Sequence, residues 1–109
     1  MPENYLGEFE QLVLLAVLRL ADEAYGLQVG DEIERVAERR PSSGALYTTL
    51  DRLEQKGHLQ SRTADASAAR GGRPRRYYAL TDAGLAALRT SGRALMRMWA
   101  GHVGMVDRR

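Results

Sequence analysis

The stretch from Ser42 to Gly57 most constrains the fold of this chain, because its spacing and its two ends together predict a helix. Pro41 precedes it, and a serine hydroxyl at position 42 or 43 can accept a hydrogen bond from a free N–H of the first turn. Gly57 can take the left-handed conformation that closes a helix. The predicted buried stripe of this helix consists of Leu46, Leu50 and Leu53.

The opposite side of this predicted helix lacks the glutamates and lysines of an ordinary solvated surface. It carries Gly44, Thr48, Asp51, Arg52 and Gln55, with Tyr47 on the flank. Short polar groups and an arginine can lie against another polar surface, such as a DNA groove. The alternative is a simple amphipathic surface helix, and this stretch alone leaves both interpretations open.

The length and composition of the chain exclude several classes of protein. A chain of 109 residues is one domain with a modest core, so a second chain would add stability. It contains no cysteine, which excludes a disulfide framework, a thiolate zinc site and a cysteine nucleophile. The N-terminus lacks the basic segment of a secretory signal, and the longest apolar run, Leu12 to Leu18, is too short to cross a membrane. We therefore expect a cytoplasmic protein that does not associate with membranes.

The net charge of +2 hides an uneven distribution along the chain. Residues 1–34 hold one arginine and eight acids, whereas residues 55–80 hold six lysines and arginines against one acid. Positive charge is thus concentrated directly after the polar-faced helix. A basic segment beside such a helix is typical of a site for a polyanion, and solubilising surface charge is the alternative.

Two further helices are predicted before this stretch. The first, Leu6 to Leu20, is apolar on nearly every side, which is typical of a helix buried in a monomer core or in a subunit interface. The second runs from Tyr25-Gly26 to about Arg39, and Pro41 stops it. With the polar-faced helix they form a helix-turn-helix pattern. The buried stripe predicted for the second helix consists of Val29, Ile33, Val36 and Ala37.

A β-hairpin is predicted after Gly57. Two short strands, His58 to Arg62 and Arg76 to Leu80, flank a small, basic loop that contains glycine. Such a hairpin after a helix-turn-helix is a wing, and its arginines suit phosphate groups. An irregular surface loop is the alternative. The wing arginines are Arg70, Arg73, Arg75 and Arg76.

The last helix is predicted to begin after Thr81, whose hydroxyl can cap it. A heptad seam of the kind that pairs helices follows, made of Leu85, Leu88, Leu95, Trp99 and Val106. Glycines at positions 101 and 104 leave the end of the helix open. The predicted fold is mainly α with a small β-hairpin. It consists of a winged helix-turn-helix DNA-binding domain in residues 1–80 and a C-terminal dimerisation helix in residues 81–109, which form one compact unit.

The order of these elements and several short motifs resemble the PadR family of bacterial transcriptional regulators. The resemblance covers roughly residues 6 to 100, and the single C-terminal helix is similar to that of the short subclass. The matching pieces are Leu6-Gly7-Glu8-Phe9-Glu10, Tyr25-Gly26-Leu27, Ser43-Gly44-Ala45-Leu46-Tyr47, Leu50-Asp51-Arg52-Leu53-Glu54, Lys56-Gly57, the run from Gly72 to Thr81, and Gly84.

The resemblance implies a homodimeric repressor that binds a roughly palindromic DNA operator and is released by a small-molecule or other effector. Thr48 departs from the family pattern, because many members have a proline at that place, and its contact is left open. The residues expected to contact DNA lie on the polar-faced helix, at its end, and on the basic hairpin. They are Ser42, Ser43, Gly44, Tyr47, Thr48, Arg52, Lys56, Arg70, Arg73, Arg75 and Arg76. Those expected in the dimer interface are Leu6, Phe9, Leu85, Leu88, Leu95 and Trp99.

Trp99, the only tryptophan, also resembles the tryptophan that stacks on planar drugs in multidrug-sensing short members. The hypothesis is that Met96 and Trp99 contact a planar or aromatic effector between two subunits. The alternative is that Trp99 only packs the dimer, since aromatic residues often anchor interfaces.

Other functions find little support in the residues. The two histidines, His58 and His102, lie in a predicted strand and near a weak helix end. No catalytic-triad order, metal-ligand spacing or phosphate-binding loop accompanies them. We therefore predict that the chain is not an enzyme, holds no metal and needs no cofactor. A winged-helix protein-interaction module without specific DNA binding is the alternative function.

Overall fold

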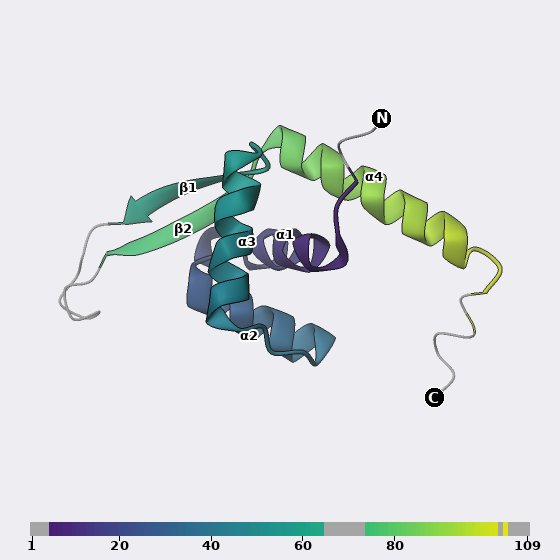
Figure 1. Cartoon of the computed structure of the whole chain (residues 1–109), viewed down its shortest axis with the longest axis horizontal. Coiled ribbons are helices and arrows are strands. Elements are labelled where there is room, and N and C mark those ends of the chain that lie inside the picture. The colour runs from purple at the N-terminus through teal and green to yellow at the C-terminus, as the bar shows by residue number, and fades with distance from the viewer. Residues whose placement is uncertain (1–4, 65–73, 103, 105–109) are drawn as a thin grey trace.

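The computed structural model describes residues 5–64, 74–102 and 104. Its elements in chain order are α1 (Glu8–Leu20), the short 3₁₀ helix η1 (Ala21–Glu23), α2 (Gly26–Ala37), α3 (Ser43–Gln55), β1 (Leu59–Ala64), β2 (Arg75–Leu80) and α4 (Asp82–Trp99). The hairpin of β1 and β2 projects to one side of α1, and α4 extends to the other (Figure 1). The predicted fold class is confirmed, since the described residues form four α-helices and one two-stranded antiparallel hairpin. Within these residues, no helix has both the length and the apolar character needed to cross a membrane.

Local hydrogen bonds shift three of the predicted boundaries. α1 begins two residues later than predicted, because Gly7 is its N-cap and donates its N–H to the Glu10 carboxylate (3.0 Å). α2 ends two residues earlier than predicted, because Glu38 takes a left-handed conformation with a φ of 57°. β1 begins one residue later than predicted, because the N–H of His58 still closes α3 by donating to the Leu53 carbonyl (2.9 Å).

Both ends of α3 carry the capping groups that the sequence predicts. Ser42 is the N-cap, and its hydroxyl accepts a hydrogen bond from the Ala45 N–H (3.1 Å). At the other end, Gly57 has a φ of 83°, and its N–H donates to the Glu54 carbonyl (3.0 Å). Glycine takes this left-handed conformation without a Cβ penalty, so the chain turns sharply from α3 into β1.

The core lies around α1, which contacts α2, α3, α4 and β2. The leucine stripe of α3 is buried there, as predicted. The prediction was wrong for Val36 and Ala37 of α2, which are exposed. They border an open hollow of about 180 Å³ between α1 and α2, which no side chain of the described residues fills. The core consists of Leu6, Val13, Leu14, Ala16, Val17, Ala24, Val29, Ile33, Leu46, Leu50, Leu53, Leu59, Tyr78, Ala87 and Leu88.

α4 is attached to the rest of the chain at two places. Thr81 is its N-cap, because the Thr81 hydroxyl accepts from the Gly84 N–H (3.0 Å). The Thr81 N–H donates to the carbonyl of His58, the residue that closes α3 (3.1 Å). Farther along, the Leu6 N–H donates to the Ser91 hydroxyl (2.9 Å). The outer half of α4 then extends away from the other helices (Figure 1).

Candidate nucleic-acid interface

The exposed face of α3 presents short polar side chains. Thr48 lies near its middle, Tyr47 on the side of α2, and Arg52 on the side of α1. The charged groups among the residues predicted for this face are one carboxylate and one guanidinium, so the face is close to neutral. All the residues predicted for it are exposed: Gly44, Tyr47, Thr48, Asp51, Arg52 and Gln55.

Tyr47 also has a packing role that the sequence did not reveal. A Cβ built on Gly26 would lie 2.6 Å from the Cε1 and Cζ atoms of Tyr47, so the ring rests directly on the start of α2. A Cβ at position 26 would force this ring to move. The side chain is 47% exposed, so one part of the ring packs and another part faces solvent. Tyr47 therefore packs against the start of α2 in addition to facing outward.

The positive side chains at the end of α3 turn toward α1. Lys56 Nζ lies 2.8 Å from Glu10 Oε2. Burial raises the pKa of Glu10, but the hydrogen bonds from Lys56 and the Gly7 N–H, with the charge of Arg52, outweigh it and lower that pKa overall. Lys56, which was predicted to contact phosphate, is thus engaged with a carboxylate of its own chain.

The two arginines at the start of β2 lie on opposite faces of the hairpin, because successive strand residues alternate. On one face, the Arg75 guanidinium lies 4.1 Å from the centre of the Tyr25 ring. On the other face lie Arg76 and the buried Tyr78. Burial raises the pKa of Tyr78, and Arg76 opposes this rise. Ser61, which pairs with Tyr78 on this face, donates its hydroxyl to the Glu54 carboxylate of α3 (2.6 Å), so this face lies against α3. Arg76 is exposed and is the one of the two that lies on the α3 side.

Arg62 of β1 is a positively charged hairpin residue that the sequence prediction missed. It pairs with Tyr77 across the hairpin, and its guanidinium lies 4.7 Å from the centre of the Tyr77 ring. The alternation of side chains along two paired strands was the signal that could have found it. The other two predicted wing arginines, Arg70 and Arg73, lie outside the described residues.

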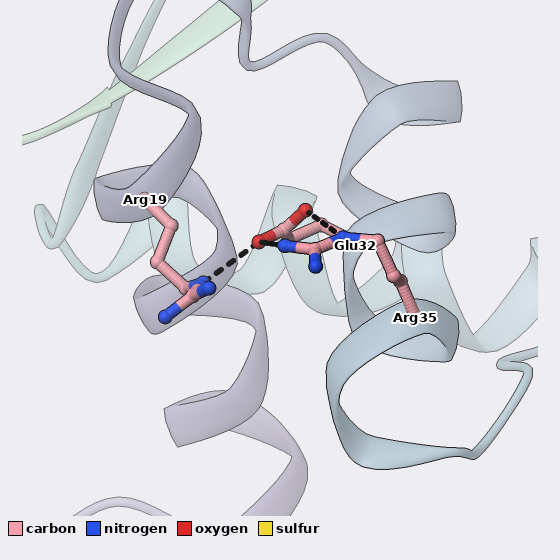
Figure 2. A network of polar contacts seen from close by, with 3 residues as sticks. All are labelled: Arg19, Glu32 and Arg35. Carbon is pink, nitrogen blue, oxygen red and sulfur yellow. Dashed lines mark hydrogen bonds and ion pairs between the residues drawn. The ribbon is translucent and has the colours of Figure 1, made fainter.

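The four arginines before α3 are used in ion pairs. Figure 2 shows Arg19 of α1 and Arg35 of α2 both bound to Glu32, at 2.7 and 2.8 Å. The hydrogen bonds from Arg35 and Arg19 lower the pKa of Glu32. These arginines join α1 to α2 and are not directed at the α3 face. Two more are paired in the same way, Arg39 with Glu8, and Arg40 with Asp31 and Glu34.

The residues predicted for a dimer interface differ in their burial. Leu6 and Leu88 are 8% and 7% exposed, so the core of this single chain already covers them. Leu95 and Trp99 are 52% and 46% exposed, on the outer half of α4. The other two predicted interface residues, Phe9 and Leu85, are partly buried.

Two strips of side chains run along α4, an apolar strip next to its buried side and an arginine strip roughly opposite that side. The apolar strip, defined here as Leu85, Leu95, Met96 and Trp99, follows helical spacing. The arginine strip, defined as Arg89, Arg93 and Arg97, has no ion-pair partner among the residues that the structure describes. Leu15 and Leu18 of α1 are also exposed, at 42% and 50%. One chain therefore leaves apolar side chains uncovered on both α1 and α4.

The arrangement of α2, α3 and the hairpin defines a winged helix-turn-helix protein, a class that presents its second helix to the major groove of DNA. Over the described part of the chain, no group of three histidine, cysteine, aspartate or glutamate residues could hold a metal ion.

Comparison with known proteins identifies the family. Residues 14–90 match the transcriptional regulator PadR-like family, and this chain belongs to it. A PadR family transcriptional regulator from Eggerthella lenta DSM 2243 has a similar structure, with a TM-score of 0.68 and 27% identity over 94% of this chain and 88% of that one. A PadR-like transcription factor from Bacteroides fragilis gives a TM-score of 0.63 and 26% identity, over 91% and 86% of the two chains.

A more distant structure supports the fold alone. A transcriptional regulator from Clostridium thermocellum has a TM-score of 0.70 at 18% identity, over 84% of this chain and 85% of that one. Comparison with curated protein sequences gives no significant match. The members of the PadR-like family are transcriptional regulators and not enzymes, which confirms the prediction that this chain is not an enzyme.

Proposed function

We propose that this PadR-like regulator is a cytoplasmic homodimer that represses transcription by binding operator DNA through α3 and the hairpin. The observation that carries the proposal is the exposed polar face of α3, which lies beside the hairpin and is free of other elements. A helix with short polar side chains can enter the major groove, which is about 12 Å wide, and reach base edges.

The α3 residues take different roles in this proposal. Ser42, Ser43 and Gly44 lie at the start of the helix, where the positive end of the dipole favours a phosphate. Thr48 and Arg52 face the bases, where an arginine can donate two hydrogen bonds to a guanine. Tyr47, next to Thr48, reaches the DNA with the solvent-facing part of its ring. Asp51 can accept a hydrogen bond from a cytosine amino group.

The wing and the end of α3 supply positive charge for the phosphate backbone. Arg76 is exposed on the α3 side of the hairpin and is the leading candidate within the described residues. Arg70 and Arg73, which lie between β1 and β2 in the sequence, with Arg75 at the start of β2 and Lys56 at the end of α3, complete the proposed set. Each phosphate contact releases condensed counterions, so binding should weaken steeply with salt.

A second copy of the chain is proposed to cover the apolar side chains of α1 and α4. The apolar strip of α4 would meet Leu15 and Leu18 of the partner in a two-fold arrangement. Residues 1–80 then serve DNA binding and residues 81–109 serve dimerisation. Two α3 helices would meet major grooves roughly 34 Å apart, on an approximately palindromic operator.

Release by an effector is proposed to act at the outer half of α4. Met96 and Trp99 are 73% and 46% exposed, and a planar ligand stacked on Trp99 would change the spacing of the two α3 helices. Because Trp99 is the only tryptophan, its fluorescence reports on this site alone. We expect planar cationic dyes to quench this fluorescence in the purified dimer. Absence of quenching across a panel of such dyes would exclude the stacking role and leave Trp99 as a packing residue.

The central experiment is an electrophoretic mobility shift with the DNA upstream of the protein's own gene, against a scrambled duplex of equal length. We expect preferential binding of the upstream DNA, with a logarithm of affinity that falls linearly with the logarithm of salt concentration. Equally weak binding of both duplexes at moderate salt would contradict the proposal. That result would favour a winged-helix module that binds another protein.

A further inference from the structure

The start of α2 lies between the hairpin and α3, and it is bonded to the hairpin through the backbone. Tyr25 forms an antiparallel bridge with Tyr77 of β2. The neighbouring Tyr78 N–H donates to the Ala24 carbonyl (2.8 Å). The segment before α2 thus pairs with the free edge of β2. An isolated two-stranded hairpin is marginal in water, so its direction depends on such contacts with the rest of the domain.

Side chains reinforce this backbone pairing. The rings of Tyr25 and Tyr77 meet edge to face, with centroids 5.5 Å apart and planes at 67°. Arg75 lies over the ring of Tyr25 at 4.1 Å, and Arg62 lies over the ring of Tyr77 at 4.7 Å. The amide of Gln28, one turn into α2, donates to the Tyr25 hydroxyl (3.1 Å). Two arginines and two tyrosines from β1, β2 and α2 therefore form one continuous column, in which each guanidinium faces an aromatic ring.

The next residue in the chain makes the contact with α3. Gly26 contacts the ring of Tyr47, and a Cβ at this position would force the ring to move. Two consecutive residues thus hold the two elements that are proposed to meet DNA. Tyr25 holds the hairpin, and Gly26 holds α3.

We propose that this Tyr25–Gly26 junction fixes the hairpin at a set distance from α3, and that Tyr25 is a positioning residue for the hairpin's phosphate contacts. This inference rests on the proposed DNA-binding function. It assigns to Tyr25 no contact with DNA. It also changes the role of Arg75, whose guanidinium binds the Tyr25 ring and so stabilises the hairpin as well as carrying charge.

The first test needs no DNA. Tyr25→Leu removes the ring but leaves an apolar side chain and the backbone bridge, whereas Tyr25→Phe keeps the ring and loses only the hydroxyl. Tyr5→Leu is the matched control, because Tyr5 is an exposed tyrosine with no ring contact among the described residues. We expect hydrogen exchange at the Tyr78 amide and along β1 and β2 to become at least tenfold faster in Tyr25→Leu only. Exchange in α3 should stay unchanged in all three variants. Unchanged exchange of the hairpin in Tyr25→Leu would overturn the inference.

The second test measures DNA affinity against salt concentration. Tyr25→Leu removes no charge, yet it should flatten the plot of log affinity against log salt by about one unit or more, because a displaced hairpin loses phosphate contacts. Tyr25→Phe and Tyr5→Leu should keep the wild-type slope. Hydrogen exchange in the hairpin could become faster in Tyr25→Leu while the salt dependence of DNA affinity stays unchanged. That result would show that the position of the hairpin does not serve DNA binding, and it would also overturn the inference.

Two further outcomes, loss of DNA binding by the wild-type protein and failure of a variant to fold, can also be interpreted. If the wild-type protein binds no DNA, the proposed function fails, while the exchange experiment still decides whether Tyr25 holds the hairpin. If Tyr25→Leu does not fold, Tyr77→Leu removes the same ring pair from the side of β2 and must give the same pattern. Loss of the whole fold in both variants would contradict the inference, since a contact that holds only the hairpin is not required by the helices.

Discussion

At Gly84 the first turn of α4 comes closer to the backbone of His58, directly before β1, than a side chain would allow. A Cβ there would lie 2.9 Å from the carbonyl carbon of His58 and still closer to its oxygen. The same carbonyl accepts the hydrogen bond from the Thr81 N–H, so it cannot move away without loosening the cap of α4. Gly84 is thus required by packing rather than by its backbone conformation, since it lies within a regular helix.

Gly84→Ala should therefore destabilise the protein, by about 1–3 kcal/mol as for other overpacked sites. The expected fall in Tm is roughly 4–8 °C for each kcal/mol in a domain of this size. Thermal unfolding followed by circular dichroism measures it. Gly44→Ala is the control in α3, because no atom of the described residues outside its own helix lies within 4 Å of its added Cβ. That variant should be neutral or more stable, since alanine is the better helix former by about 0.5–1 kcal/mol. Equal melting temperatures for the two variants would contradict the packing argument.

At the scale of elements, α3 and the hairpin divide the proposed work of reading and holding DNA. The α3 face is short and nearly neutral, which suits base edges, whereas the α3 side of the hairpin presents the guanidinium of Arg76. Base contacts give sequence preference, and phosphate contacts give affinity that does not depend on sequence.

Thr48→Ala and Arg76→Ala should accordingly have different effects on operator binding. Thr48→Ala should change the preference at one operator position by about 1–3 kcal/mol and leave the salt slope as it is. Arg76→Ala should weaken binding to every sequence and reduce the salt slope by about one. Competition binding to a set of single-base operator variants, repeated at several salt concentrations, separates the two. A shift of base preference in Arg76→Ala with an unchanged salt slope would contradict this division.

At the scale of the whole molecule, the chain is elongated, with principal extents of 53, 36 and 22 Å, and the outer half of α4 is uncovered. An exposed apolar strip on a projecting helix is typical of a surface that a partner covers. In the proposed two-fold dimer each substitution in the strip acts twice, once in each chain.

Leu95→Gln should raise the dissociation constant of the dimer by roughly tenfold or more, because burying one leucine contributes about 1.5–3 kcal/mol. Sedimentation equilibrium across a range of protein concentrations measures this constant. Ala86→Gln is the control, since Ala86 is also exposed on α4 but lies on the side of the arginine strip. A dimer that is equally stable in both variants, or a wild-type chain that is monomeric, would contradict the proposed interface.

Local signals in the sequence were enough to predict the fold class and most elements. Ser42, Gly57 and Thr81 cap helices through hydrogen bonds or backbone conformations that involve near neighbours, and the structure has all three where predicted. The leucine stripe and the polar face of α3 follow from helical spacing alone, so the exposure of its predicted residues could also be read in advance. These properties depend on residues a few positions apart.

Only the tertiary structure decided what each side chain meets across the domain. Helical spacing could not say that α2 leaves Val36 uncovered, because burial depends on which neighbouring element lies opposite. Nor could residue type say that Lys56 pairs with Glu10 or that Arg75 lies over Tyr25, since these partners are far apart in the chain. The sequence by itself determined the helices, the hairpin and the family. The packing of distant segments decided which charges stay free for DNA and how the hairpin is held beside α3.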